Sequence, residues 1–135
     1  MSTQGNKSVV RSFFKGFEDG NLEQLDHLTT DDFTFWVTPT TVRSGTYNKE
    51  KWLEAVSGIR GELAGPMTLQ LGDLTAEDDR VSVTVVGNLP FKSGKVFNSH
   101  YHILFWLRDG KISAVKEYLD TYQVGQIFGF PSTTA

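Results

Sequence analysis

Residues 97–122, FNSHYHILFWLRDGKISAVKEYLDTY, decide the fold of this chain. The first eleven residues of this stretch are mostly aromatic or aliphatic, and a second β-rich run, 112–122, follows Asp109-Gly110. An Asp-Gly pair between two such runs is the strongest short-range signal for a β-hairpin with a two-residue type I′ turn. The stretch therefore predicts two long antiparallel strands.

Helical signals dominate the N-terminal third. Apolar residues recur at helical spacing over 9–17, and Gly20 supplies a C-terminal stop. Asn21 stands where it would cap a second, short helix, and Asn48 where it would cap a third. A β-rich run over 33–37 lies between the second and third helices. This part of the chain predicts three helices and one strand.

Beyond the third helix the apolar period changes from 3.6 to two, which predicts four long strands ending with the hairpin. The element order indicates an α+β fold, with three helices packed on one face of a curved antiparallel sheet. The 135 residues suffice for a single domain, 1–135.

Composition excludes several classes of protein. The chain has no cysteine, which rules out disulfides, thiolate nucleophiles and cysteine-bound zinc. Its 13 Lys and Arg against 16 Asp and Glu argue against a nucleic-acid partner. No secretion signal and no membrane-spanning apolar run is evident, so we expect no membrane partner and a cytoplasmic location. The 17 aromatic residues must fill a core or line a cavity.

The histidines of the hairpin form the main candidate site. His100 and His102 are two residues apart and share one face of their strand. With Asp109 and Gly110 as the loop, His102 faces Glu117 across the hairpin, and directly opposed Cβ atoms lie about 4.5–5.5 Å apart. Glu117 would then orient His102 as a catalytic acid/base. A satisfied polar pair without chemistry is the alternative, and a three-residue loop would shift the register and separate the two.

Two further interpretations concern metal and partners. His100, His102 and Glu117 could bind a metal, but no fourth ligand is near, so we predict neither a metal nor another cofactor. The opposite strand face, with Tyr101, Ile103 and Phe105, is also apolar and predicts a homodimer interface. In the loop before the third helix, Arg43 and Tyr47 either rim a pocket or are simply solvated.

The whole chain resembles a known superfamily. The quoted hairpin with its DGKI and EYLDT segments, together with FEDGNLE at 17–23, is similar to the nuclear transport factor 2-like (NTF2-like) superfamily, in its SnoaL-like and ketosteroid-isomerase-like branch. The resemblance implies a cone-shaped fold with a deep pocket between the helices and the concave sheet face. This fold hosts many unrelated activities.

The resemblance also implies positions for pocket residues. His102 falls where steroid isomerases carry a protonated oxyanion-hole acid, and Val115 falls on the pocket wall. The position of their catalytic base falls near Val37 or Thr38, and that of their oxyanion tyrosine falls on Phe13, so the steroid isomerase mechanism is disfavoured. The Asp-Arg-Asp set of limonene-epoxide-hydrolase-like relatives is not recognisable.

These arguments predict a cofactor-independent SnoaL-like enzyme, of isomerase, cyclase, dehydratase or hydrolase type, acting on a small apolar ring-containing compound. His102 and Glu117 are its predicted catalytic residues. Two alternatives remain: a non-catalytic ligand-binding protein, and a dimeric interaction module whose cavity is filled by Phe13, Phe35 and Trp106. The predicted substrate-binding residues are Phe13, Phe17, Phe35, Val37, His100, Leu104, Trp106, Val115 and Leu119.

Overall fold

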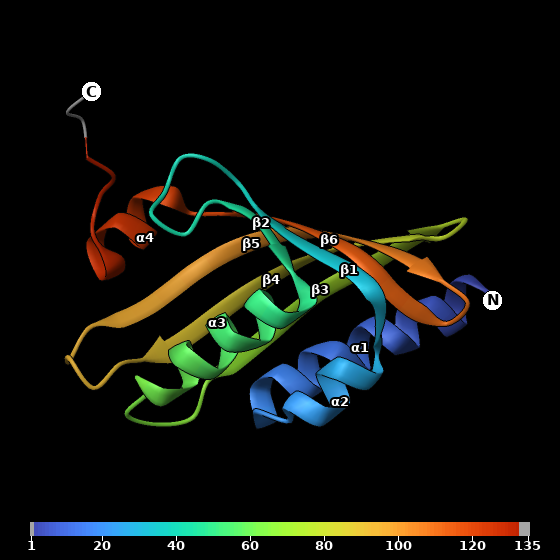
Figure 1. The fold of residues 1–135 in the computed structure, drawn as a ribbon, viewed down its shortest axis with the longest axis horizontal. Coiled ribbons are helices and arrows are strands. Elements are labelled where there is room, and N and C mark those ends of the chain that lie inside the picture. Colours follow the sequence, from blue (N-terminus) through green and yellow to red (C-terminus); the bar gives the residue numbers. More distant parts are fainter. Residues whose placement is uncertain (1, 133–135) are drawn as a thin grey trace.

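A six-stranded sheet curls around the first helix in the computed structural model, which describes residues 2–132 (Figure 1). The strand order is β2-β1-β6-β5-β4-β3. No helix among the described residues is both long and apolar enough to cross a bilayer. The elements are α1 (Thr3–Asp19), α2 (Leu22–His27), β1 (Thr29–Val37), β2 (Gly45–Asn48), α3 (Lys49–Gly61), β3 (Thr68–Glu77), β4 (Arg80–Pro90), β5 (Val96–Arg108), β6 (Lys111–Leu119) and α4 (Thr121–Phe128).

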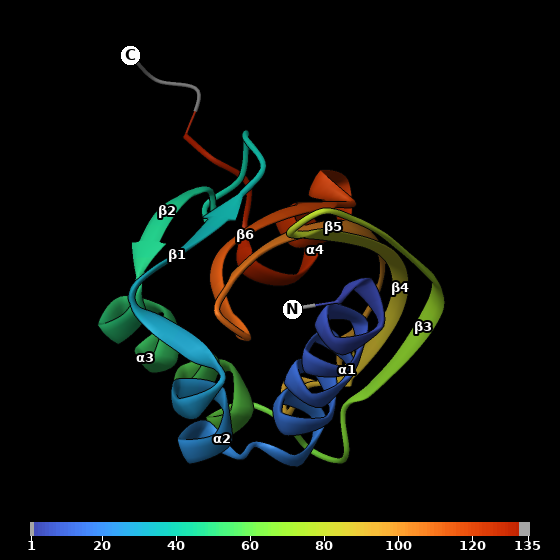
Figure 2. The same cartoon turned by 90° about the vertical axis from the view of Figure 1, so that its right-hand side faces the viewer.

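The α+β class and the curved sheet covered by helices are confirmed. Figure 2 shows the sheet curving around α1, while α2 and α3 lie beside β1. A closing helix, α4, follows the sheet and contacts β5, where the spacing of Val124, Ile127 and Phe128 predicts a short closing turn or helix. One detail of the expectation is wrong. The sheet is mixed and not purely antiparallel, because β1 pairs in parallel with β6, with Phe35 beside Val115.

Local capping signals explain where the helices begin and end. Gly20 ends α1 with a φ of 67°, a left-handed conformation that glycine adopts without strain. The Asn21 side chain accepts a hydrogen bond from the backbone N–H of Gln24 at the start of α2. Asn48 does the same for Lys51 at the start of α3. These caps sit where the sequence predicts them.

The hairpin turn is also as expected, but a bulge follows it. Asp109 and Gly110 both have positive φ angles, 51° and 78°, as a type I′ turn requires. The ladder then shifts by one residue, so that Ser113 has no partner on β5 and donates its hydroxyl hydrogen bond to the carbonyl of Trp106. A β-bulge of this kind places one extra residue in a strand and changes the register beyond it.

The bulge overturns the predicted pairing of His102 with Glu117. Beyond it, Tyr118 lies opposite His102, and Glu117 lies opposite Ile103. Directly opposed residues point to the same face of a sheet, so His102 and Glu117 lie on opposite faces. The prediction of the turn is correct, but the register further along the strand depends on a bulge that the turn residues do not specify.

The two faces of β5 are also the reverse of the expectation. Ile103 and Phe105 are 5% and 0% exposed and face the helices, whereas His100 and His102 are exposed on the outer face. Both faces of the strand are apolar in the sequence, and the helices cover the one without histidines. The predicted dimer face of Tyr101, Ile103 and Phe105 is therefore the inner wall of the fold, and that part of the prediction is wrong.

Many of the aromatic residues form the core next to this wall. The Phe13 ring stacks on Trp52 of α3, with centroids 5.6 Å apart, and meets Phe105 edge-on at 5.3 Å. Such pairs add about 0.5–1.5 kcal/mol beyond the apolar area they bury. The cluster fixes α1 and α3 against the sheet and so determines the walls of the space between them.

Candidate functional site

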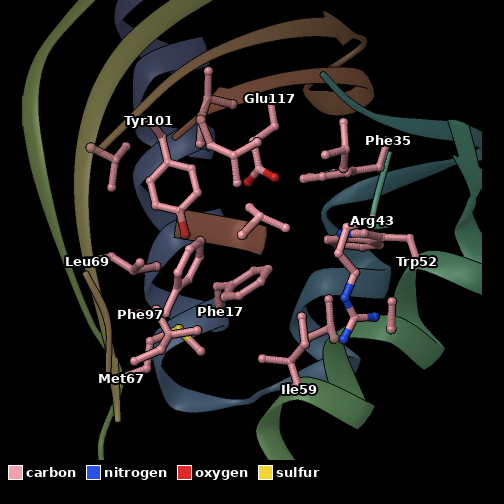
Figure 3. A pocket seen from close by; sticks show the side chains of 18 of the residues that line it. Phe17, Phe35, Arg43, Trp52, Ile59, Met67, Leu69, Phe97, Tyr101 and Glu117 are labelled. Atoms are coloured by element: carbon pink, nitrogen blue, oxygen red, sulfur yellow. The ribbon is translucent and has the colours of Figure 1, made fainter. Parts of the chain in front are cut away.

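A pocket with a cavity of about 130 Å³ lies between the helices and the inner sheet face (Figure 3). An apolar cavity of this order accommodates one benzene-sized ring. Helices α1, α3 and α4 and all six strands contribute to its lining, which is almost entirely aliphatic or aromatic. The titratable residues in the lining are Arg43, Tyr47, Tyr101 and Glu117.

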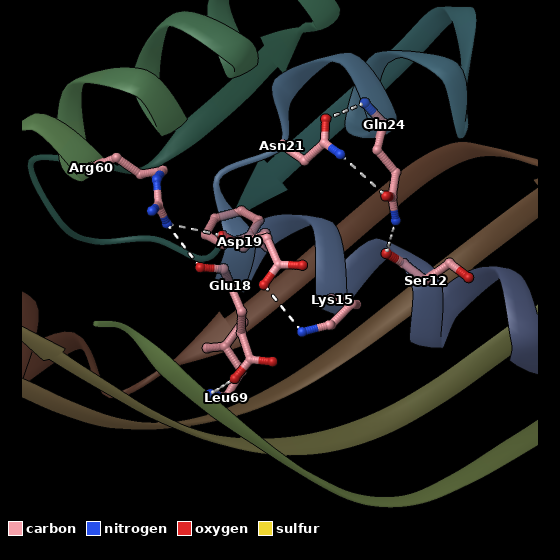
Figure 4. Close-up of polar contacts among 9 residues, drawn as sticks. Ser12, Lys15, Glu18, Asp19, Asn21, Gln24, Arg60 and Leu69 are labelled. Atoms are coloured by element: carbon pink, nitrogen blue, oxygen red, sulfur yellow. Dashed lines mark hydrogen bonds and ion pairs between the residues drawn. The ribbon is translucent and has the colours of Figure 1, made fainter. Parts of the chain in front are cut away.

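Polar contacts hold the pocket end of α1 in place (Figure 4). Arg60 of α3 donates hydrogen bonds to the carbonyls of Phe17 and Glu18, at 3.2 and 3.1 Å. The Glu18 carboxylate accepts a hydrogen bond from the backbone N–H of Leu69 on β3, at 2.8 Å. A Cβ at Gly20 would collide with the Arg60 side chain. The last turn of α1, which carries Phe17 into the pocket, is thus tied to both α3 and β3.

Glu117 is the acidic residue of the pocket. It projects from β6, between Ile103 of β5 and Val37 of β1, and its carboxylate points into the cavity. Within residues 2–132 the carboxylate makes no hydrogen bond or ion pair. The residue is partly buried and lines the apolar pocket, so its carboxylate is less hydrated than that of an exposed glutamate.

Burial raises the pKa of Glu117 to about 7. Removal from water disfavours the charged form of a carboxyl, and nothing nearby compensates for that loss. A carboxyl with such a pKa exists in both protonation states near neutral pH, which is the condition under which a general acid/base works best.

Tyr101 provides a second polar group in the same pocket. It lies on β5 opposite Leu119, and its ring reaches into the cavity (Figure 3). Burial, and to a lesser degree the charge of Glu117, raises the pKa of the Tyr101 phenol well above its usual value. The phenol therefore keeps its proton and can donate a hydrogen bond to a ligand. A Cβ at Gly87 would lie only 3.0 Å from the ring, so β4 has a glycine where Tyr101 passes.

Arg43 borders the pocket from the loop between β1 and β2. Its guanidinium lies over the ring of Phe128 in α4, 4.4 Å from the centroid. The loop itself is well bonded, since the Tyr47 hydroxyl donates to the Arg43 carbonyl at 2.7 Å and the Ser44 hydroxyl donates to the Thr38 carbonyl at 2.6 Å. Of the two interpretations of Arg43 and Tyr47, the structure supports the one in which they rim a pocket.

The residues predicted to bind substrate fall into three groups. On the pocket wall, beside Glu117, lie Phe13, Phe17, Phe35, Val37 and Leu119. Val115 faces inward but is 1% exposed in the core and does not line the cavity. On the outer face of the sheet lie His100, His102, Leu104 and Trp106.

The predicted role of His102 in the pocket is therefore wrong. Its Nε2 lies 2.6 Å from the Ser82 hydroxyl on the neighbouring strand, outside the cavity. The metal interpretation fails for the same reason, because the sheet separates His100 and His102 from Glu117. No group of three potential metal ligands occurs anywhere in the described part of the chain.

Sequence reasoning missed Tyr101 as a pocket residue. The alternation of side chains along β5 indicated it. The residues that share a strand face with Phe97 and Phe105 have no charged or imidazole side chain, as expected for the buried face. The prediction takes the histidine face of β5 as the pocket side and therefore places Tyr101 outside the pocket. Glu117 was identified, but with the wrong partner.

The fold and the pocket together define a cone-shaped α+β protein with a single acidic group in an apolar cavity. The sequence model of the SnoaL-like domain family matches residues 10–115, and the chain belongs to this family. A comparison with curated protein sequences found no significant match.

Solved structures with the same fold cover nearly the whole chain at low identity. An NTF2-like protein from Burkholderia xenovorans is 21% identical, with a TM-score of 0.75, over 93% of this chain and 97% of its own. IdmH of Streptomyces antibioticus, a proposed polyketide cyclase, is 18% identical, with a TM-score of 0.75, over 92% and 98%. An LEH-like epoxide hydrolase of M. tuberculosis is 14% identical, with a TM-score of 0.74, over 92% of this chain and 89% of its own. These likenesses establish the fold.

Proposed function

We propose that this protein is a cofactor-independent enzyme that moves a proton on a small, apolar, ring-containing compound, with Glu117 as the general acid/base. The observation that carries the proposal is an unpaired carboxyl in an apolar pocket, with a pKa raised by burial to about 7. General acid–base catalysis by a positioned side chain contributes about 100-fold to 10,000-fold to a rate.

Tyr101 complements Glu117 in this proposal. Removing a proton next to a carbonyl places negative charge on the carbonyl oxygen, and a hydrogen-bond donor aimed at that oxygen stabilises it. Tyr101 lines the same cavity on the neighbouring strand, and its phenol stays protonated. A base and a donor facing one apolar space are the minimal set for enolisation of a ketone.

The comparisons support a small-molecule enzyme without specifying its reaction. Relatives of this fold are described as a proposed polyketide cyclase and as an epoxide hydrolase. The steroid isomerase arrangement stays disfavoured, because Phe13 and Val37 line the pocket as apolar groups. The proposed acid/base lies instead on β6.

One of the alternative functions has an observation in its favour. A ligand-binding protein without chemistry would have the same almost wholly apolar lining. The interaction module with a filled cavity fits less well, because Phe13 and Phe35 line an open space and Trp106 lies outside it.

Deuterium exchange tests the proposed chemistry without knowledge of the natural substrate. Cyclohexanone matches the cavity in size, and loss of its α-proton signals in D₂O, followed by ¹H NMR, reports enolisation. We expect the protein to accelerate the exchange, Glu117→Gln to slow it about 100-fold or more, and Tyr101→Phe to slow it about 10-fold to 100-fold.

The matched control is Glu54→Gln, which makes the same change on the exposed side of α3. It should exchange at the rate of the unmodified protein. An equal rate in Glu117→Gln would eliminate Glu117 as the acid/base and favour the binding protein.

We also propose that a second copy of the chain covers the outer sheet face, in place of the face first expected. Trp36 and Tyr118 meet edge-on there, with ring centroids 5.1 Å apart. A groove on this face is lined by Trp36 and Trp106 and carries both signs of charge, Asp79 against Arg108 and Lys116. A face with both signs can pair with a copy of itself rotated by a two-fold axis.

A further inference from the structure

Arg43 is the cation of the pocket lining, and its guanidinium has no anionic partner among the described residues. Its backbone N–H donates to the Thr41 hydroxyl at 2.9 Å, and its carbonyl accepts from Tyr47. The guanidinium, in contrast, makes no hydrogen bond or ion pair to any residue in 2–132. It lies over the ring of Phe128, half-buried. The loop thus holds the Arg43 backbone in place, while the N–H groups of the guanidinium have no acceptor among the described residues.

The stacking leaves the donors of Arg43 available. A guanidinium stacked on an aromatic ring uses its face, whereas its five N–H groups lie in its plane and need acceptors of their own. Figure 3 shows the Arg43 side chain entering the pocket across from Tyr101. The donors are therefore presented to whatever occupies the pocket or its entrance.

Glu117 accepts no hydrogen bond from the Arg43 guanidinium. The two residues line the same cavity but form no ion pair. Burial is the cause of the raised pKa of Glu117, as expected for a carboxylate that has no ion-pair partner.

We propose that Arg43 binds a carboxylate of the ligand, so that the ring-containing compound of the proposed function carries an acid group next to the apolar ring that occupies the cavity. A guanidinium and a carboxylate match in geometry, since two parallel N–H···O bonds form at once. A phosphate fits less well, because the lining offers no second cation for its second charge. The inference rests on the proposed function, in that the same pocket binds the same ligand.

A matched pair of probes tests this inference by calorimetry. Cyclohexanecarboxylate and cyclohexanecarboxamide have nearly the same shape and differ in charge. At pH 6 and low salt we expect the carboxylate to bind about 10-fold to 100-fold more tightly, the range for hydrogen bonds to a charged group. Arg43→Gln should reduce the preference below about 3-fold, and Arg43→Lys should retain part of it, because the charge remains and the fork is lost.

Arg11→Gln is the control, since it removes the same charge from an exposed position on α1. It should keep the full preference for the carboxylate. Circular dichroism and the amide NMR spectrum establish that each variant is folded, and the comparison within the unmodified protein does not depend on any variant.

Three outcomes would overturn the inference: equal affinity for both probes, an unchanged preference in Arg43→Gln, or binding of neither probe to the unmodified protein. Failure of the proposed function would show elsewhere, as unaltered deuterium exchange in Glu117→Gln. The two failures are therefore read from different measurements on different residues.

Discussion

At the scale of single residues, Glu117 determines what this pocket can do. The carboxyl has an ordinary pKa of 4.5, and burial raises its pKa to about 7 in the folded chain. The folded protein therefore holds a proton that the unfolded chain has already released between these pH values. Each unit of difference corresponds to about 1.4 kcal/mol, so the cost of keeping this group in the pocket depends on pH.

The sign of that dependence can be tested. Because the folded state binds more protons, the free energy of unfolding should fall as pH rises from about 4.5 through about 7, and stay lower above it. Glu117→Gln removes the titrating group. It should therefore stabilise the protein at pH 8 by up to about 3 kcal/mol, and change stability little at pH 4.5.

Urea denaturation at pH 4.5, 6 and 8 measures this difference. Glu54→Gln, on the exposed side of α3, serves as the reference. If the stability curves of Glu117→Gln and of the unmodified protein run parallel with pH, the raised pKa of Glu117 is refuted.

At the scale of secondary structure elements, β4 and β5 cooperate to place Tyr101. The Tyr101 ring lies against Gly87, and a Cβ there would come within 3.0 Å of it. We expect Gly87→Ala to destabilise the protein by about 1–3 kcal/mol, the usual cost of overpacking, and to slow cyclohexanone exchange because the phenol moves. Urea denaturation and the exchange rate measure the two effects.

Gly58 of α3 offers a matched control for this substitution. A Cβ at Gly58 would meet nothing within 4 Å, and the position lies in the interior of the helix. Gly58→Ala should therefore stabilise the protein by up to about 1 kcal/mol. A neutral or stabilising Gly87→Ala would show that the strand can accommodate the methyl group and that Tyr101 is not held by this contact.

Among the features of the secondary structure, some can be predicted from local sequence and one cannot. The Asp109-Gly110 turn and the caps at Gly20, Asn21 and Asn48 were all predictable, because each depends on a few neighbouring residues. The bulge at Ser113 was not predictable, because it depends on how β6 pairs with both β5 and β1. That single residue places Glu117 opposite Ile103 instead of His102.

At the scale of the whole molecule, the outer sheet face forms the interface of the proposed homodimer. Sedimentation velocity should give about twice the chain mass of 15.1 kDa. A charge placed on this face, as in Leu104→Glu, should shift the protein toward the monomer, because two such carboxylates would be desolvated together.

Val42→Glu tests whether any exposed apolar residue has this effect. Val42 is 49% exposed in the loop between β1 and β2, and this variant should remain dimeric. Sedimentation of the unmodified protein as a single chain would refute the dimer.

The sequence by itself determined the α+β class, the positions of the helices, the hairpin turn and the presence of Glu117 in a β-rich, apolar strand. These follow from spacing and from turn or cap chemistry, which act over a few residues. Only the tertiary structure decided that Tyr101 faces the cavity, that His100 and His102 do not, and that Arg43 reaches the pocket with no anionic partner in the part of the chain that the structure describes. Both faces of β5 are apolar, so the choice between them depended on where α1 and α3 pack, and packing is a property of the whole chain.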